Sequence, residues 1–166
     1  MSTIDDLKEA FAGESQANRR YLAYGEKAAA DGFPGVARLF RGVAAAETVH
    51  ALAHLKAMDG VAATAENLAE AMAGEKHEFT EMYPPMVATA EAEGHRKAAR
   101  SMRFALAVEK VHYELFAAAL AAVAAGRDIE AVSVHVCPVC GHTVIGPVEG
   151  PCPVCGARPD LYEEIA

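Results

Sequence analysis

Carboxylates and imidazoles recur at matched positions in four segments of this chain that are otherwise rich in apolar residues. Two of the segments carry a Glu and a His three residues apart, and the other two carry acids alone. Ionised carboxylates are rarely buried singly, because desolvation is costly unless a cation or another partner compensates for it. The candidate metal-ligating and catalytic residues are therefore Glu14, Glu47, His50, Glu75, Glu78, Glu109 and His112.

The two Glu-x-x-His pairs have the spacing of a shared metal site. Residues three apart lie on one face of a helix, about one turn from each other, so Glu47 and Glu109 can bridge two ions. Single acids from two further helices complete the arrangement found in di-iron and di-manganese bundles. Oxygen and imidazole ligands suit iron or manganese, whereas a zinc site normally has fewer carboxylates. We expect a pair of iron ions.

A second metal site is predicted near the C-terminus, where all the cysteines fall in two Cys-Pro-Val-Cys-Gly motifs. Each motif turns two thiolates toward one ion, and its glycine tolerates a left-handed backbone. Because this tail is too short to form a sufficient hydrophobic core, the metal should supply most of its folding free energy. Zinc fits this spacing, but iron could exchange electrons with a di-iron site, so we expect iron, with zinc possible in recombinant protein. The ligands are Cys137, Cys140, Cys152 and Cys155.

The first 125 residues are rich in helix-forming residues, with apolar residues at three- and four-residue spacing. Four long segments joined by short turns predict an all-α, antiparallel four-helix bundle. Glu14 and Glu75 are 61 residues apart, and Glu47 and Glu109 are 62 apart, which indicates two similar helix pairs. The expected helix ends are near Gly32, Gly60, Gly94 and Gly126.

Two local features are expected in the third segment. Pro84 and Pro85 should kink it, because an interior proline removes a hydrogen bond and clashes with the preceding turn. Thr64 is its expected N-cap. After Gly126 the composition changes to Val, Cys, Pro and Gly, which predicts a bundle domain over 1–126, a linker over 127–134 and a small metal-binding domain over 135–166.

Composition excludes several functional classes. A hydrophobic share of 52% over 166 residues is enough for a packed core. The net charge of −8 argues against nucleic acid as a partner, because proteins that neutralise phosphates usually carry a basic face. The N-terminus lacks a basic region followed by an apolar stretch, and the longest apolar run, 115–125, is too short for a bilayer. We expect a cytoplasmic protein with no membrane partner.

With these ligands, the entry Glu14-Ser15-Gln16-Ala17-Asn18, the stretch 73–84 and the cysteine motifs, the chain resembles the rubrerythrins over nearly its whole length. The resemblance implies a ferritin-like bundle that holds two iron ions and a rubredoxin-like domain that holds one. It also implies that one iron exchanges His50 for Glu78 on oxidation, and that Tyr21 and Tyr83 lie around the ligands. Packed aromatic residues are the alternative for these tyrosines. The tail departs from rubrerythrins in having no tryptophan, and His142 replaces a frequent aromatic residue.

The expected function is a peroxidase that reduces hydrogen peroxide to water, with electrons relayed through the four-cysteine iron. The resemblance implies reduced pyridine nucleotide as the electron source, and the absence of a nucleotide-binding glycine loop requires an external reductase or rubredoxin. It also implies a head-to-tail homodimer, in which each rubredoxin-like iron faces the partner's di-iron site. A linker that folds back onto its own chain is the alternative.

Two other functions fit parts of the sequence. A ferritin-like ferroxidase or iron-handling protein would use the same bundle ligands. A metal-stabilised binding module would carry zinc in the tail and have no turnover. Glu78 and the redox-capable tail favour the peroxidase over both.

Overall fold

The computed structural model describes residues 2–130 and 133–165 and contains two compact units, Met1–Ala62 and Ala63–Ala166. Unit 1 is a helical hairpin, and unit 2 holds the other helices and a C-terminal sheet. Ala131 and Val132 of the predicted linker, and the terminal residues Met1 and Ala166 of the predicted domains, lie outside the described residues. Every described helix falls short of the length and apolar character that crossing a membrane would require.

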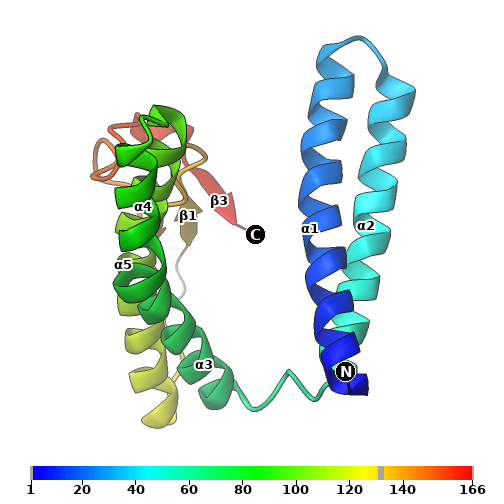
Figure 1. Ribbon diagram of the computed structural model, residues 1–166. Helices are drawn as coiled ribbons and strands as arrows, with labels where there is room; N and C mark the ends of the chain where they lie inside the picture. The colour runs from blue at the N-terminus through cyan, green and yellow to red at the C-terminus, as the bar shows by residue number, and fades with distance from the viewer. Residues whose placement is uncertain (1, 131–132, 166) are drawn as a thin grey trace. The chain divides into compact units, whose positions relative to one another are not determined.

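Unit 1 consists of two antiparallel helices that run side by side (Figure 1), α1 (Thr3–Ala30) and α2 (Pro34–Ala57). Ser2 and Asp5 form a capping box at the start of α1: Ser2 Oγ accepts from the Asp5 amide at 3.3 Å, and the Asp5 carboxylate accepts from the Ser2 amide at 2.9 Å. Gly32, at φ +85°, makes the tight turn into α2. The predicted end of the first helix is confirmed.

Small residues line the contact between α1 and α2. Gly25 and Ala28 of α1 are buried, as are Ala37, Ala44 and Ala51 of α2. A Cβ atom added to Gly25 would lie 3.3 Å from the Ala37 carbonyl oxygen. The absence of a side chain at Gly25 is therefore what lets the two helices approach closely at this level.

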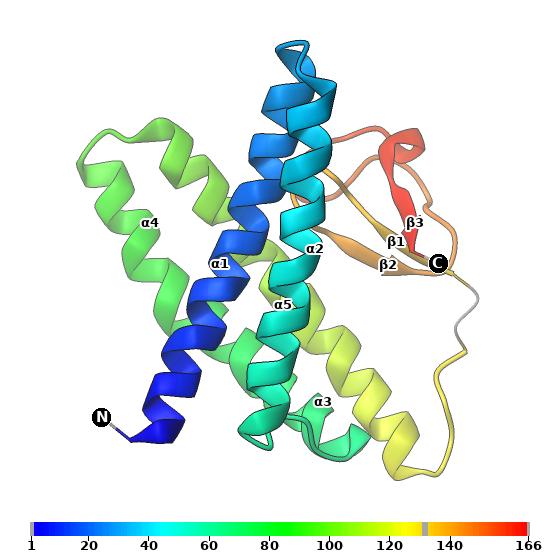
Figure 2. The ribbon, with the colours of Figure 1, turned by 90° about the vertical axis from the view of Figure 1, so that its right-hand side faces the viewer.

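The third helix predicted from the sequence begins unit 2 and consists of three consecutive parts: α3 (Thr64–His77), the π-helix η1 (Glu78–Met82) and α4 (Tyr83–Ala92). The long helix α5 (Arg96–Ala124) follows (Figure 2). Pro84 and Pro85 lie in the first turn of α4, where they have no amide hydrogen to donate. The Tyr83 amide instead donates to the carbonyl of Glu78, five residues earlier. The predicted irregularity is present, and it takes the form of a π-helical turn before the prolines.

The start of α3 corrects one prediction. Thr64 is the first helical residue, and Ala63 occupies the N-cap position. The Glu66 carboxylate accepts a hydrogen bond from the Ala63 amide at 3.2 Å, so this end of the helix is stabilised without a capping hydroxyl. The predicted ends near Gly94 and Gly126 are confirmed, and both glycines have positive φ.

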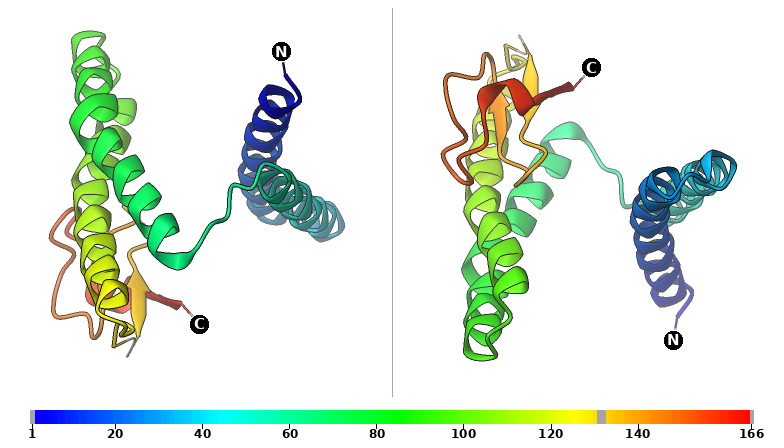
Figure 3. Two further views of the ribbon diagram at one scale, coloured as in Figure 1. Left: turned by 90° about the horizontal axis from the view of Figure 1, so that it is seen from below. Right: turned by 90° about the horizontal axis from the view of Figure 1, so that it is seen from above.

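The C-terminal part of unit 2 forms an antiparallel sheet in the order β2-β1-β3, whose strands are β1 (Val134–Val136), β2 (Thr143–Ile145) and β3 (Glu163–Ile165). A 3-10 turn, η2 (Pro159–Leu161), precedes β3. The sheet lies beside α5 and contacts it through β2 (Figure 3). The tail of this chain thus folds back onto a helix of its own unit. The predicted division at residues 126 and 134 stays a prediction.

We expect Gly25→Leu to destabilise the protein by about 1–3 kcal/mol, because the added side chain would push against the Ala37 carbonyl. Urea unfolding followed by circular dichroism measures the change. Gly42→Leu in α2 is the matched control, since no atom lies within 4 Å of a Cβ built there. Equal unfolding midpoints for the two variants would contradict the close approach at Gly25.

Candidate metal centres

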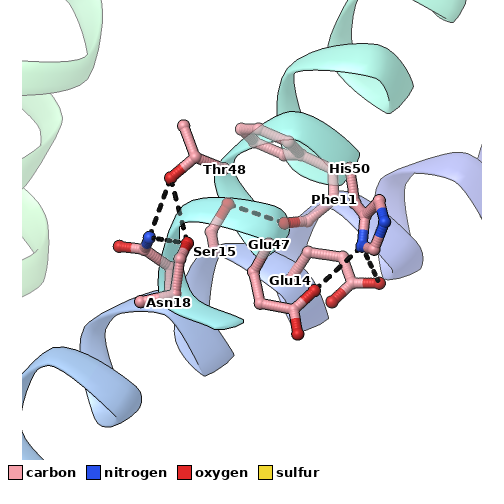
Figure 4. Close-up of polar contacts among 8 residues, drawn as sticks. Phe11, Glu14, Ser15, Asn18, Glu47, Thr48 and His50 are labelled. Carbon is pink, nitrogen blue, oxygen red and sulfur yellow. Dashed lines mark hydrogen bonds and ion pairs between the residues drawn. The ribbon is translucent and has the colours of Figure 1, made fainter. Parts of the chain in front are cut away.

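Unit 1 brings three predicted ligands together, which we call the first donor cluster: Glu14 of α1 with Glu47 and His50 of α2 (Figure 4). His50 Nδ1 lies 2.9 Å from Glu47 Oε2 and 3.9 Å from Glu14 Oε1. One donor atom from each residue falls within 4.8 Å of the others. This is the separation expected of side chains that share a cation.

Unit 2 repeats this arrangement in the second donor cluster, Glu75 of α3 with Glu109 and His112 of α5. His112 Nδ1 lies 2.8 Å from Glu109 Oε2 and 3.8 Å from Glu75 Oε2. The internal repeat that the sequence spacing indicated is therefore present in the geometry of the ligands. Each cluster supplies two carboxylates and one imidazole, which is half of a di-iron ligand set.

Polar contacts behind the first donor cluster hold α1 against α2. Asn18 Nδ2 donates to the Ala44 carbonyl at 2.7 Å and to Thr48 Oγ1 at 2.8 Å (Figure 4). Asn18 follows Glu14 by one turn, and Thr48 follows Glu47 directly. This bridge fixes the distance between the backbones that carry the two acids. The sequence analysis did not assign it, although the four-residue spacing from Glu14 placed Asn18 on the same face.

The second donor cluster is held from the tail. Thr143 of β2 lies with its Oγ1 3.0 Å from His112 Nε2, and the same hydroxyl donates to the Gly141 carbonyl at 3.0 Å. The His112 side chain is 25% exposed, whereas that of His50 is 55% exposed within its unit. No sequence signal pointed to Thr143, because it lies in a strand, 31 residues after His112, which is in a helix.

The acids of unit 2 repel one another. Burial raises the pKa of Glu75, and the neighbouring Glu109 carboxylate raises it further, while His112 acts in the opposite direction. Burial also raises the pKa of Tyr83, as do the charges of Glu78, Glu109 and Glu75. An apolar cavity of about 460 Å³ borders this cluster and has Leu68, Leu115, Phe116 and Ile145 in its wall. The apolar surroundings strengthen the repulsion between the Glu75 and Glu109 carboxylates, and a bound cation would relieve it.

The remaining predicted residues lie as follows. Glu78 begins the π-helix and is half-buried, close enough to Tyr83 to affect its pKa, but it is not part of the second donor cluster. Tyr21 packs against the rings of Tyr24 and Phe40, with centroids 6.3 and 6.1 Å away. The roles of Glu78, Tyr21 and Tyr83 around the metals stay predictions.

The four cysteines converge on one point. Cys137 Sγ is 3.6 Å from Cys155 Sγ, and Cys140 Sγ is 3.5 Å from Cys152 Sγ. A tetrahedral ion with metal–sulfur bonds of about 2.3 Å would place its sulfurs about 3.8 Å apart, whereas a disulfide requires about 2.05 Å. The spacing fits a four-thiolate metal site. Gly141 and Gly156 have φ of +84° and +76°, as the motif required.

The thiols of this site differ in acidity. Burial opposes ionisation of Cys152, but hydrogen bonds from Tyr162 and from the amides of Cys155 and Val154 lower its pKa to about 6. Burial raises the pKa of Cys140, and its neighbouring thiols add to the effect. A metal ion must therefore displace protons from the less acidic thiols when it binds, which couples metal affinity to pH.

Replacing Glu75 tests the repulsion within the second donor cluster. A carboxyl whose pKa is raised on folding contributes most to stability at low pH and loses that contribution as pH rises through its folded pKa. Glu75→Gln should therefore raise the melting temperature of the metal-free protein at neutral pH, with a gain that shrinks as the pH falls. Calorimetry from pH 4 to pH 8, a range of about four units that begins near the ordinary pKa of a glutamate, measures the melting temperatures. Glu70→Gln, at an exposed position of the same helix, should show no such gain.

Comparison with known proteins extends the match to the whole chain. The rubrerythrin family model matches residues 5–120. Rubrerythrin-2 of Clostridium acetobutylicum is 35% identical over 97% of this chain and 95% of its own length. Nigerythrin of Nitratidesulfovibrio vulgaris is 34% identical over 97% of this chain and 85% of its own. The mixed-valence structure of nigerythrin has a TM-score of 0.58 at 31% identity, covering 99% of this chain and 87% of that one.

These matches confirm the resemblance inferred from the ligands and the cysteine motifs. They also confirm the fold class, a mostly helical ferritin-like protein with a small rubredoxin-like C-terminal domain. The chain carries donor sets for two iron ions in its helices and for one iron ion in its cysteine cluster, as expected. We conclude that the chain belongs to the rubrerythrin family of di-iron oxidoreductases.

Proposed function

We propose that this protein is a peroxidase that reduces hydrogen peroxide to water at a pair of iron ions. The observation that carries the proposal is the presence, in one chain, of two matched donor clusters together with a four-thiolate site. When bound, the iron pair would supply Lewis acidity and electrons for cleavage of the O–O bond. The proposed ligands are Glu14, Glu47, His50, Glu75, Glu78, Glu109 and His112, with Cys137, Cys140, Cys152 and Cys155 at the rubredoxin-like iron.

The protein side chains have distinct parts in this proposal. Glu47 and Glu109 each lie beside a histidine Nδ1, so the two Glu–His pairs would hold the iron ions together with Glu14 and Glu75. The raised pKa of Tyr83 keeps its hydroxyl protonated beside three acids. That hydroxyl can donate a hydrogen bond to bound peroxide without adding another negative charge. Reduction of one peroxide to two waters consumes two electrons and two protons.

The proposed electron source is reduced pyridine nucleotide, acting through an external reductase or rubredoxin. The four-cysteine iron would pass the electrons onward one at a time. A redox-active tetrathiolate site suits this role, and this chain has no glycine-rich nucleotide loop of its own. The free thiols suit a reducing compartment, so we place the protein in the cytoplasm.

We also propose that the working form is a homodimer, as expected from the resemblance, but with shared di-iron sites in place of the expected head-to-tail arrangement: one chain's first donor cluster meets the partner's second cluster, beside the cysteine domain that contacts α5 of the same chain. A ferritin-like fold contains a long crossover connection, whereas only residues 58–63 join α2 to α3. Glu47 lies ten residues before the end of α2, and Glu75 lies eleven residues after the start of α3. If α2 and α3 ran parallel in one bundle with Glu47 and Glu75 at the same level, the end of α2 and the start of α3 would be about 31 Å apart along the bundle axis. Six residues reach only about 24 Å.

Apolar residues of unit 1 are left uncovered by its own two helices. Leu39 and Val49 are each 66% exposed, and Leu52 is 48% exposed. Large apolar side chains left in water favour association with another apolar surface. The helices of unit 2 in a second copy of the chain would offer such a surface together with the missing ligands.

Rapid mixing of the fully reduced, iron-loaded protein with peroxide or with oxygen tests the function. We expect peroxide to oxidise the iron pair faster than oxygen does. Glu109→Gln, which removes a proposed ligand, should slow this step by at least about 10-fold to 100-fold, the loss typical when only a partner behind a metal ligand is removed. Glu70→Gln should react as the wild type does. Preference for oxygen, with turnover of excess ferrous iron, would indicate a ferroxidase instead, and a tail that holds only zinc in native protein would indicate a binding module.

Subunit complementation tests the shared site. One variant combines Glu47→Gln with His50→Ala, and the other combines Glu109→Gln with His112→Ala. Each alone should be inactive, but co-expressed chains should regain peroxidase activity, because a mixed dimer contains one site with every ligand intact. Mass photometry measures the dimer fraction. Mixed dimers that stay inactive would show that each site is built within one chain.

A further inference from the structure

Thr143 lies between His112 and the first cysteine motif. Its hydroxyl donates to the Gly141 carbonyl at 3.0 Å, which leaves the hydroxyl oxygen able to accept from His112 Nε2, 3.0 Å away. His112 Nδ1, 2.8 Å from Glu109 Oε2, faces the carboxylates of the second donor cluster. With a metal ion bound at Nδ1, the ring proton is on Nε2 and donates to Thr143 Oγ1.

We propose that Thr143 is a positioning residue that holds His112 in its metal-binding tautomer and ties the cysteine domain to the second donor cluster of its own chain. The proposal rests on the metal site of the proposed function. Thr143 touches no predicted metal, so it acts through the imidazole it holds. Hydrogen bonding at the second ring nitrogen is a general means of orienting a metal-bound histidine.

The packing around the first cysteine motif supports this docking. Val108 of α5 is 2% exposed, and its Cγ1 would lie 3.9 Å from a Cβ atom built on Gly141. The Gly141 amide donates to the Cys137 carbonyl at 2.9 Å, which closes the turn of the motif. The motif therefore rests on the residue directly before Glu109. The carbonyl of Gly141, the residue after Cys140, is connected through the Thr143 hydroxyl to His112.

The first donor cluster shows what the second would be without this clamp. His50 occupies the equivalent place in the repeat and makes the same Nδ1 contact to its own Glu, at 2.9 Å against 2.8 Å for His112. Among the described residues of unit 1, none bonds Nε2 of His50. Thr143 thus makes two chemically equivalent histidines unequal. A held His112 and a less constrained His50 agree with the ligand exchange expected at His50.

The same contacts form a continuous bonded route from the four-cysteine site to the second donor cluster of the same chain. In the loaded protein, one electron would leave the ferrous four-cysteine iron, which becomes ferric, and reduce one ferric ion of the pair to the ferrous state. No proton needs to move along the route. Loss of the Thr143 hydroxyl would replace two hydrogen bonds by a gap between the Gly141 peptide and the His112 ring.

Thr143→Val tests the proposal, with Thr143→Ser as the conservative variant. Thr89→Val is the matched control, because Thr89 is an exposed threonine whose hydroxyl donates to the Pro85 carbonyl of its own helix. In full-length zinc-loaded protein, ¹⁵N NMR reports the tautomer and the exchange of the His112 Nε2 proton. We expect this proton to exchange rapidly in Thr143→Val, and zinc affinity of the helical site to fall by about 10-fold to 100-fold. Thr143→Ser and Thr89→Val should match the wild type.

A second measurement separates positioning from simple loss of structure. In iron-loaded Thr143→Val, electron transfer from the four-cysteine iron should slow by about 10-fold, a fall of the size seen when a partner behind a metal ligand is removed. The metal content and visible spectrum of the cysteine site should stay unchanged. An unaltered Nε2 proton and unaltered zinc affinity would overturn the proposal. The NMR result does not depend on peroxide, so a wild type without peroxidase activity would refute the proposed function alone.

Discussion

The crowding of carboxylates on half-buried helix faces is the constraint on which the rest of this structure depends. Each donor cluster places two acids and an imidazole within 4.8 Å, and in unit 2 burial and the neighbouring acid both raise the pKa of Glu75. Without a cation the ionised form of Glu75 opposes folding, and with one the side chains of both clusters would become its ligands. Features such as the Asn18 bridge and the Gly25 contact hold backbones at the separation that the clusters need.

Within each unit, the fully buried apolar side chains are mostly small. The buried hydrophobic residues are mostly alanines, and the largest fully buried side chains among the described residues are those of Val108 and Cys137. Because small side chains remove little apolar surface from water, each contributes modestly. The tail has three strands of three residues each, so its four thiols and their ion must provide most of its order. Metal binding is thus part of the fold in both regions of the chain.

Sequence periodicity and ligand spacing predicted most of this arrangement, because both act within one helix turn. Helix ends at Gly94 and Gly126 followed from the backbone freedom of glycine. The capping of α3 was assigned one residue late, since the Glu66 carboxylate does what a hydroxyl at Thr64 was expected to do. The π-helix could not be predicted, because two prolines require a break without specifying its hydrogen bonds. The Thr143 contact depends on how the tail docks on α5, which no local pattern encodes.

The internal repeat gives two ligand sets of nearly equal geometry, yet only the second is followed in sequence by a cysteine domain. A duplicated half-site by itself would bind two ions alike. Attachment of a further domain to one half breaks that equivalence, since a hydroxyl from β2 can reach His112 in the same unit. The asymmetry needs no difference between the ligands themselves. A hydroxyl bound at Nε2 of His112, with none from unit 1 at Nε2 of His50, would be enough to give the two metal positions different freedom, and that hydroxyl comes from the domain that would supply the electrons.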